Sequence, residues 1–182
     1  MYTIDNNHIY ELTIKNSRFI TVLNKINDIN DIADVISHLK NEYPNATHYC
    51  YAYILDDIKR YSDDGEPIGT AGIPILKVLE SHNLNKIICV VIRYFGGIKL
   101  GANGLIRAYT KCSANAIKET ELKELIEGIN LDITFPYSYV KEIDYMLRDI
   151  KINSKVYDDE ITYNIDIPNV FLDQIINKQI NY

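Results

Sequence analysis

The sequence predicts an α+β protein built from two units, and three observations support this class. Strand-like and helix-like segments alternate through the first two thirds of the 182 residues. The last third has the order strand, helix, strand, strand, helix, which is the ferredoxin-like order without its last strand. The balance of charges also changes near residue 120. Because 47% of the residues are hydrophobic, the chain can bury a sizeable core, which excludes wholesale disorder.

The first unit, residues 1–119, is expected to alternate strands with helices. Strands are expected where Val, Ile and Tyr gather between turn residues, at residues 9–14, 18–26, 48–55 and 86–95. Helices are expected where apolar residues recur every three or four positions, over residues 74–81 and 104–118 and from an N-cap at Asp28 or Asn30 to about residue 42. The continuous apolar run at 87–92 is typical of a central strand buried on both faces. The polar stretch 56–66 is expected to be a loop.

The second unit, residues 120–182, is shorter and acidic. Its strands are expected at residues 125–135, 152–157 and 160–167, and its helices at 138–150 and 169–179. Only residues 180–182 remain to form a last strand. Residues 1–120 carry 13 acidic and 13 basic side chains, whereas residues 121–182 carry 12 acidic and 6 basic ones. The first unit is therefore neutral, and the second carries the whole net charge of −6.

Composition excludes several classes of protein. The negative net charge gives no global attraction to nucleic acid, so any anion site must be local. No apolar run reaches the roughly 18 residues of a membrane span, and the first residues do not resemble a signal peptide. Three cysteines without a CxxC pair, Cys50, Cys89 and Cys112, indicate reduced, buried thiols. We therefore expect a cytoplasmic protein without membrane contact.

The most informative stretch is a glycine-rich loop between the predicted central strand and the helix that follows it. Glycines let a backbone turn sharply and approach a ligand, and the start of a helix attracts anions. Arg93, Lys99 and Arg107 bring three cations to this loop, and Asn103 is expected to be the helix N-cap. A phosphate or carboxylate site is thus predicted at Arg93, Tyr94, Gly96, Gly97, Lys99, Gly101, Asn103, Gly104 and Arg107.

A structural interpretation of the same loop stays open. Its glycines match neither the dinucleotide pattern GxGxxG nor the P-loop pattern, and they can equally serve a tight turn. In that case the cations would pair with nearby carboxylates, which are Asp63, Asp64 and Glu66. These carboxylates could also hold Mg²⁺ or act as acid and base, but their spacing is not that of an EF-hand, and turn residues or partners for the arginines are favoured. We therefore expect no metal and no cofactor. His48 opens a predicted strand and is expected to have a supporting role.

Four stretches together resemble the YigZ/IMPACT family, namely residues 17–20, 46–48, 62–72 and 93–109. The resemblance covers about residues 1–118, with Asn103 standing where the family usually has glycine. It implies a two-layer α/β domain like domain 2 of ribosomal protein S5, followed by a ferredoxin-like domain similar to those of elongation factor G. The eukaryotic relatives regulate translation by competing for the activator of an initiation-factor kinase. The bacterial relatives have been suspected of binding nucleic acid or the ribosome.

Three functions remain open from the sequence. The first is a non-enzymatic, translation-associated regulatory protein that binds RNA, the ribosome or a translation factor through the phosphate-accepting loop. The second is an enzyme for a phosphorylated metabolite or nucleotide, in which Asp63, Asp64 or Glu66 supplies a base or a Mg²⁺ contact. The third is a protein-interaction module that uses the acidic second unit. We expect the first, and the sequence leaves the oligomeric state open.

Overall fold

The computed structural model describes residues 1–171 and divides the chain into two compact units, one ending at Leu125 and one beginning at Ile126. The division was expected at 119/120. It falls later because β7 (Leu122–Glu124) pairs antiparallel with β1 (Tyr2–Ile4). The N–H of Leu125 also bonds to the main-chain oxygen of Met1. Residues 120–125 therefore belong to the first unit.

A five-stranded antiparallel sheet forms the centre of the first unit. Its order is β2-β3-β6-β4-β5, with β2 at His8–Ile14, β3 at Ser17–Lys25, β6 at Ile87–Tyr94, β4 at His48–Leu55 and β5 at Ile58–Ser62. Every residue of β6 except Tyr94 is buried, which confirms the predicted central strand. The predicted loop at 56–66 is wrong in part, since β5 lies inside it. β5 is an exposed edge strand, and its polar residues are those of a surface segment.

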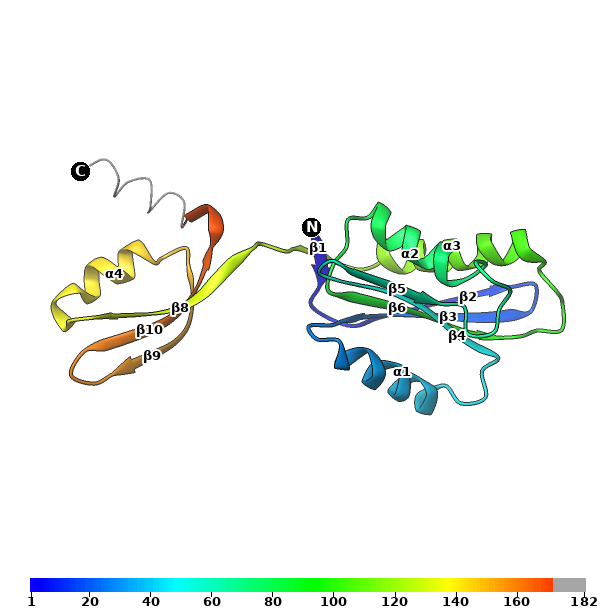
Figure 1. The fold of residues 1–182 in the computed structure, drawn as a ribbon, viewed down its shortest axis with the longest axis horizontal. Helices are drawn as coiled ribbons and strands as arrows, with labels where there is room; N and C mark the ends of the chain where they lie inside the picture. The colour runs from blue at the N-terminus through cyan, green and yellow to red at the C-terminus, as the bar shows by residue number, and fades with distance from the viewer. Residues whose placement is uncertain (172–182) are drawn as a thin grey trace. The chain divides into compact units, whose positions relative to one another are not determined.

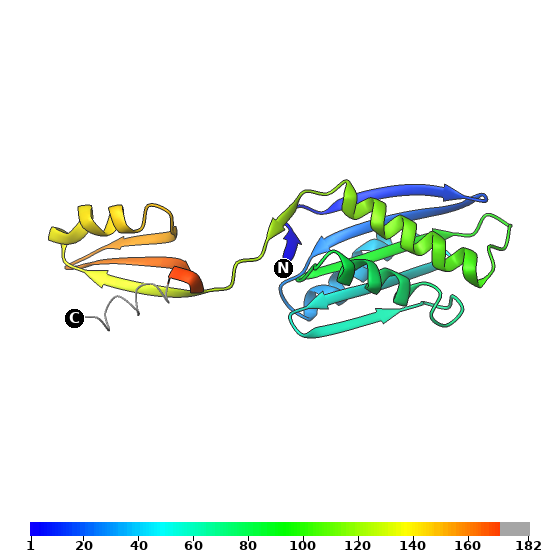
Figure 2. The ribbon, with the colours of Figure 1, turned by 90° about the horizontal axis from the view of Figure 1, so that it is seen from above.

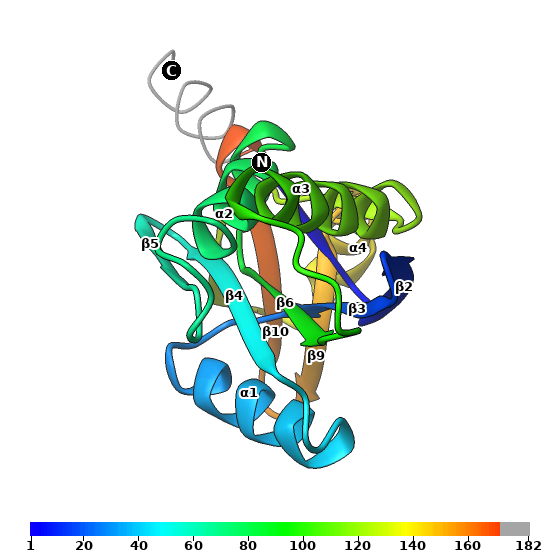
Figure 3. The ribbon, with the colours of Figure 1, turned by 90° about the vertical axis from the view of Figure 1, so that its right-hand side faces the viewer.

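Helices cover both faces of this sheet (Figures 1 and 3). α1 (Asn30–Glu42) packs on one face, where Ile32 and Leu39 meet Ile88 of β6. α2 (Gly72–Ser81) and α3 (Ala102–Lys118) run side by side over the other face, as Figure 2 also shows. Their core includes Cys89, the next residue along β6, because successive side chains of a strand point to opposite faces. The expected two-layer arrangement is therefore wrong, since α1 adds a third layer.

The second unit follows the expected order of strand, helix, strand, strand. It contains β8 (Gly128–Phe135), a 3₁₀ turn η1 (Tyr137–Tyr139), α4 (Val140–Met146), β9 (Lys151–Tyr157) and β10 (Ile161–Pro168). The sheet order is β8-β10-β9, and both pairings are antiparallel. The helix is shorter than the expected 138–150, since it opens with η1 and ends at Met146. Most of the helix expected at 169–179, and the last strand, lie outside the described residues.

Candidate functional site

A cavity of about 410 Å³ opens in the first unit where the glycine loop meets the start of α3. β4 and β6 form its floor, since His48 and Arg93 are direct partners across these two strands. The loop before α2 contributes one wall, and the loop between β6 and α3 contributes the other. The lining residues are Thr47, His48, Glu66, Pro67, Arg93, Phe95, Lys99, Leu100, Gly101, Ala102 and Leu105. Its size suits a small ligand or one group of a larger one.

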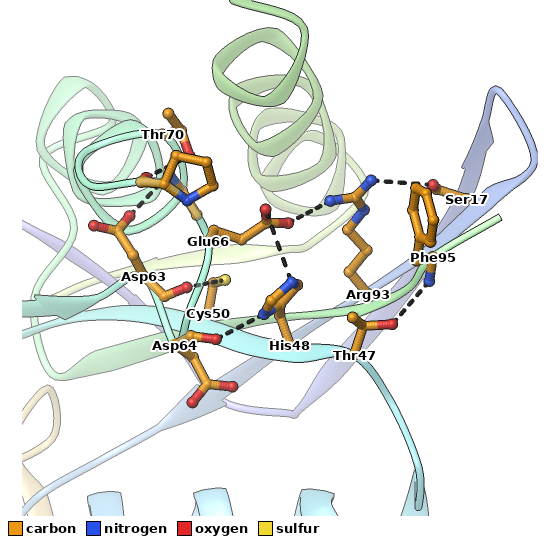
Figure 4. A network of polar contacts seen from close by, with 12 residues as sticks. Ser17, Thr47, His48, Cys50, Asp63, Asp64, Glu66, Thr70, Arg93 and Phe95 are labelled. Carbon is orange, nitrogen blue, oxygen red and sulfur yellow. Dashed lines mark hydrogen bonds and ion pairs between the residues drawn. The ribbon is translucent and has the colours of Figure 1, made fainter. Parts of the chain in front are cut away.

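Two of the lining residues, Arg93 and Glu66, form a buried ion pair, which Figure 4 shows. Nη1 of Arg93 donates to Oε1 of Glu66 at 2.5 Å, and the two side chains are only 5% and 4% exposed. The hydroxyl of Tyr109 donates to the same carboxylate oxygen at 2.9 Å, and Nη2 of Arg93 donates to Oγ of Ser17 at 3.3 Å. The charge of Arg93 is therefore balanced by a carboxylate of the chain itself, as the structural interpretation predicts.

Two hydrogen-bond acceptors beside this pair have no donor among the described residues. Oε2 of Glu66 lies 3.9 Å from Nε2 of His48, beyond hydrogen-bond distance. Nδ1 of His48 lies 2.7 Å from the main-chain oxygen of Asp64. A carbonyl only accepts, so Nδ1 carries a proton, and in the neutral form of the ring Nε2 is a second acceptor. Both acceptors belong to residues that line the cavity.

The start of α3 supplies hydrogen-bond donors to the same place. The first main-chain bond into the helix runs from the N–H of Leu105 to the oxygen of Gly101, at 2.9 Å. The N–H groups of Ala102, Asn103 and Gly104 have no acceptor within residues 1–171. Together with the helix dipole, these N–H groups attract negative charge. The side chain of Lys99, at the mouth of the cavity, adds a full positive charge.

The glycines of the loop have different reasons for being glycine. A Cβ on Gly96 would lie 2.0 Å from the main chain of Asn16, so the close approach of the loop to the β2–β3 turn requires glycine. The N–H of Gly96 also donates to Oγ of Ser17 at 3.2 Å. Gly97 and Gly101 have positive φ angles of 84° and 70°, which side chains rarely adopt. Gly96 is therefore needed for packing, whereas the other two shape the turn.

Two residues predicted for the site lie elsewhere, and a third does not have the role predicted for it. Arg107 is exposed and does not line the cavity. Tyr94 packs against the core under α1, on the opposite face of the sheet, and its hydroxyl donates to the oxygen of Pro44. α3 begins at Ala102, two residues earlier than expected, so Asn103 lies inside the helix and is not its N-cap. Gly101 occupies the N-cap position instead.

The carboxylates of Asp63 and Asp64 are committed to the local fold. Asp63 accepts the N–H groups of Gly69, Ala71 and Gly72 at 2.8 to 3.0 Å, and so holds the start of α2. Asp64 accepts the N–H of Tyr49 at 2.6 Å. Neither carboxylate lines the cavity. Across residues 1–171, no group of three or more His, Cys, Asp or Glu side chains is placed to hold a metal ion.

All three cysteines are buried in the first unit, as the sequence predicts. Burial raises the pKa of each thiol to about 12, although Sγ of Cys50 lies within 3.3 Å of the Tyr109 hydroxyl and Sγ of Cys89 contacts Ser113. The thiolate is the reactive form of cysteine, so none of the three is an activated nucleophile.

Comparison with known proteins identifies the family. The Impact N-terminal domain matches residues 15–117. The chain is 38% identical over 151 residues to the IMPACT family member YvyE of Bacillus subtilis (strain 168), covering 81% of this chain and 70% of that protein. It is 43% identical over 149 residues to an IMPACT family member of Haemophilus influenzae, covering 79% and 72% of the two chains. The crystal structure of a hypothetical protein superimposes with a TM-score of 0.69 at 28% identity, over 99% of this chain and 91% of that one.

These matches define a class and a family. The chain contains an Impact N-terminal domain in a mixed α/β fold. It therefore belongs to the IMPACT family, which confirms the resemblance seen in its motifs. None of the helices within residues 1–171 is both long enough and apolar enough to cross a lipid bilayer.

Proposed function

We propose that this chain is a translation-associated regulatory protein whose first unit binds RNA through a phosphate group held in the cavity at the start of α3. The observation that carries the proposal is the meeting of Lys99 with the free N–H groups at the start of α3 in one cavity. The association with translation rests on membership of the IMPACT family and on the resemblance of the motifs to eukaryotic members, which implies a role in regulating translation.

The charges favour a single phosphate over an extended backbone. Arg93 is neutralised by Glu66, and Arg107 lies outside the cavity, so Lys99 and the helix dipole supply the attraction. A protein that neutralises one or two phosphates of a single strand should show a logarithmic salt slope of about −1. Under this proposal, a phosphate group of ribosomal RNA would bind in the same cavity. A cytoplasmic location belongs to this proposal, since translated RNA is there.

The finer fold assignments belong to the same proposal. The order β8-β10-β9, with α4 connecting the two outer strands, supports a ferredoxin-like second unit. The likeness of the first unit to domain 2 of ribosomal protein S5 stays a prediction.

Two matched variants test the proposal. Binding of a fluorescently labelled single-stranded RNA, or of ribosomes, is measured by anisotropy or co-sedimentation at 50 to 300 mM salt. Lys99→Ala should weaken binding about three- to tenfold and flatten the salt dependence by about one unit of slope. Arg107→Ala removes the same charge from the exposed face of α3, away from the cavity, and should change neither. Equal effects of the two variants, or no salt dependence in the parent protein, would contradict the phosphate site.

A further inference from the structure

The two free acceptors in the cavity, Nε2 of His48 and Oε2 of Glu66, are not used by a phosphate group. A phosphate oxygen would repel both, so a ligand that places its phosphate at α3 must bring something else to this end of the cavity. Oε2 of Glu66 accepts no hydrogen bond within residues 1–171, and a ligand that fills this end of the cavity displaces water from it, so the ligand must supply a donor in return. This end of the site therefore calls for a hydrogen-bond donor from the ligand.

The spacing of the acceptors defines the kind of donor. The two atoms are 3.9 Å apart. If one donor atom lies about 2.8 Å from each acceptor, the angle acceptor–donor–acceptor is roughly 90°. An amine has two N–H bonds and can direct one toward each acceptor with nearly straight hydrogen bonds. A hydroxyl has one proton and would leave the second acceptor facing its oxygen. The geometry therefore selects an amine.

The neighbouring charges define the charge state of that amine. Nη1 of Arg93 already donates to the other oxygen of Glu66, and Lys99 lies at the mouth of the same cavity. A charged ammonium group on Glu66 would therefore lie close to a guanidinium and would be repelled. An amino group on an aromatic ring is uncharged and avoids this cost. Such a ring can also stack on Phe95, which lines the cavity and is 46% exposed.

We infer that this end of the cavity is a subsite for the amino group of adenine or cytosine, so that the site selects amino-bearing nucleotides. The inference rests on the proposed phosphate site and adds to it a choice of base. Nδ1 of His48 is held by the carbonyl of Asp64, and Oε1 of Glu66 is held by Arg93 and Tyr109. Both acceptors are thus oriented before the ligand arrives, which favours discrimination.

Two pairs of nucleotides test the subsite on the full chain. AMP and IMP differ by an amine in place of a carbonyl, with its accompanying proton on the ring, and CMP and UMP differ in the same way. Titration calorimetry should give AMP a dissociation constant at least about tenfold lower than that of IMP, and CMP one lower than that of UMP by a similar factor. Ribose 5-phosphate serves as the probe for the phosphate alone, and phosphoethanolamine as the probe for an alkyl ammonium.

Each outcome has one meaning. Equal affinities within both pairs, with ribose 5-phosphate bound, overturn the amine subsite and leave the phosphate site standing. Tighter binding of phosphoethanolamine than of AMP also overturns it, because the subsite would then prefer a cation. If neither ribose 5-phosphate nor any nucleotide binds, the proposed function fails and the inference fails with it.

Variants add an independent test. His48→Ala removes one of the two acceptors and should lower the AMP to IMP ratio several-fold without weakening IMP, whereas Lys99→Ala should weaken both nucleotides equally. His38→Ala, at an exposed position of α1, removes a histidine away from the cavity and should leave the ratio unchanged. A ratio in His48→Ala that equals that of the parent protein would overturn the inference.

Discussion

Removing one partner of the buried Arg93–Glu66 pair should destabilise the first unit strongly. In the parent structure the side chain of Glu66 is only 4% exposed. The Arg93→Met variant leaves its carboxylate with one donor, the hydroxyl of Tyr109 at 2.9 Å. Breaking a buried pair from one side costs about 3–5 kcal/mol, and the remaining hydrogen bond favours the lower value, about 3 kcal/mol. For a urea dependence of about 1.5 kcal/mol per molar, the unfolding midpoint falls by about 2 M.

The cysteines provide an assay for the first unit alone. Cys50, Cys89 and Cys112 are all buried there, and the second unit contains none. The reaction of these thiols with a chromogenic disulfide reagent, followed across a urea series, therefore reports the unfolding of this unit. A spectroscopic signal to which both units contribute would not separate the unfolding of the first unit from that of the second.

Two further variants decide whether the loss comes from an uncompensated charge. Arg93→Met combined with Glu66→Leu should be less destabilised than Arg93→Met alone, since no charge remains buried. Arg18→Met breaks the Arg18–Glu11 pair, whose side chains are 50% and 47% exposed, and should leave the midpoint unchanged. A shift below about 0.5 M for Arg93→Met, or a double variant as unstable as the sum of the singles, would refute the reasoning.

Two other predictions concern packing and pH. Gly96→Ala should destabilise the first unit several times more than Gly97→Ala in the same thiol assay. A Cβ on residue 96 would collide with the main chain of the β2–β3 turn, whereas a Cβ on residue 97 would meet open space and cause strain only through its positive φ angle. In the second unit, hydrogen bonds from Asn130, Asn153 and Lys151 lower the pKa of Asp166 to about 2. Its contribution to stability should therefore be present above about pH 4 and be lost as the pH falls toward 2, as measured by amide NMR signals of β10.

Each of these has a clear contrary result. Equal midpoints for the two glycine variants would show that the loop can move away from the turn. For the pH prediction, Asp166→Asn is the control, because it keeps the shape of the side chain without its charge. If this variant loses stability between pH 4 and 2 as steeply as the parent protein does, the dependence arises from another group.

The strongest parts of the fold were visible in the sequence because they depend on local pattern. The apolar run of β6 identified the central strand, and the helical spacing of Ile32 and Leu39 identified α1. β5 was missed because an edge strand is paired on one side only and can be polar. That α1 covers its own face of the sheet is set by tertiary packing, which no local pattern reveals.

The site was predicted less well, and the errors have physical causes. At about 100° per residue, Arg107 points away from the stripe formed by Leu105, Ala108 and Cys112, so the periodicity of α3 already excluded it from a site on the inner side. The pairing of Arg93 with Glu66 was considered as the structural alternative. The contact between His48 and Glu66 depends on the shape of the loop that also carries the Asp64 carbonyl, which spacing along the chain does not encode.

The pairing of β1 with β7 bears on how this domain can be excised. The family match spans residues 15–117, yet Ile4 is fully buried, β2 completes the hydrogen bonding of β3, and β7 holds β1 in place. A fragment trimmed to the matched range would strip one side of the sheet and leave the β3 edge open to other chains. Residues 1–125 form one compact unit that includes β1, β2 and β7, so experiments on the isolated domain should use this range.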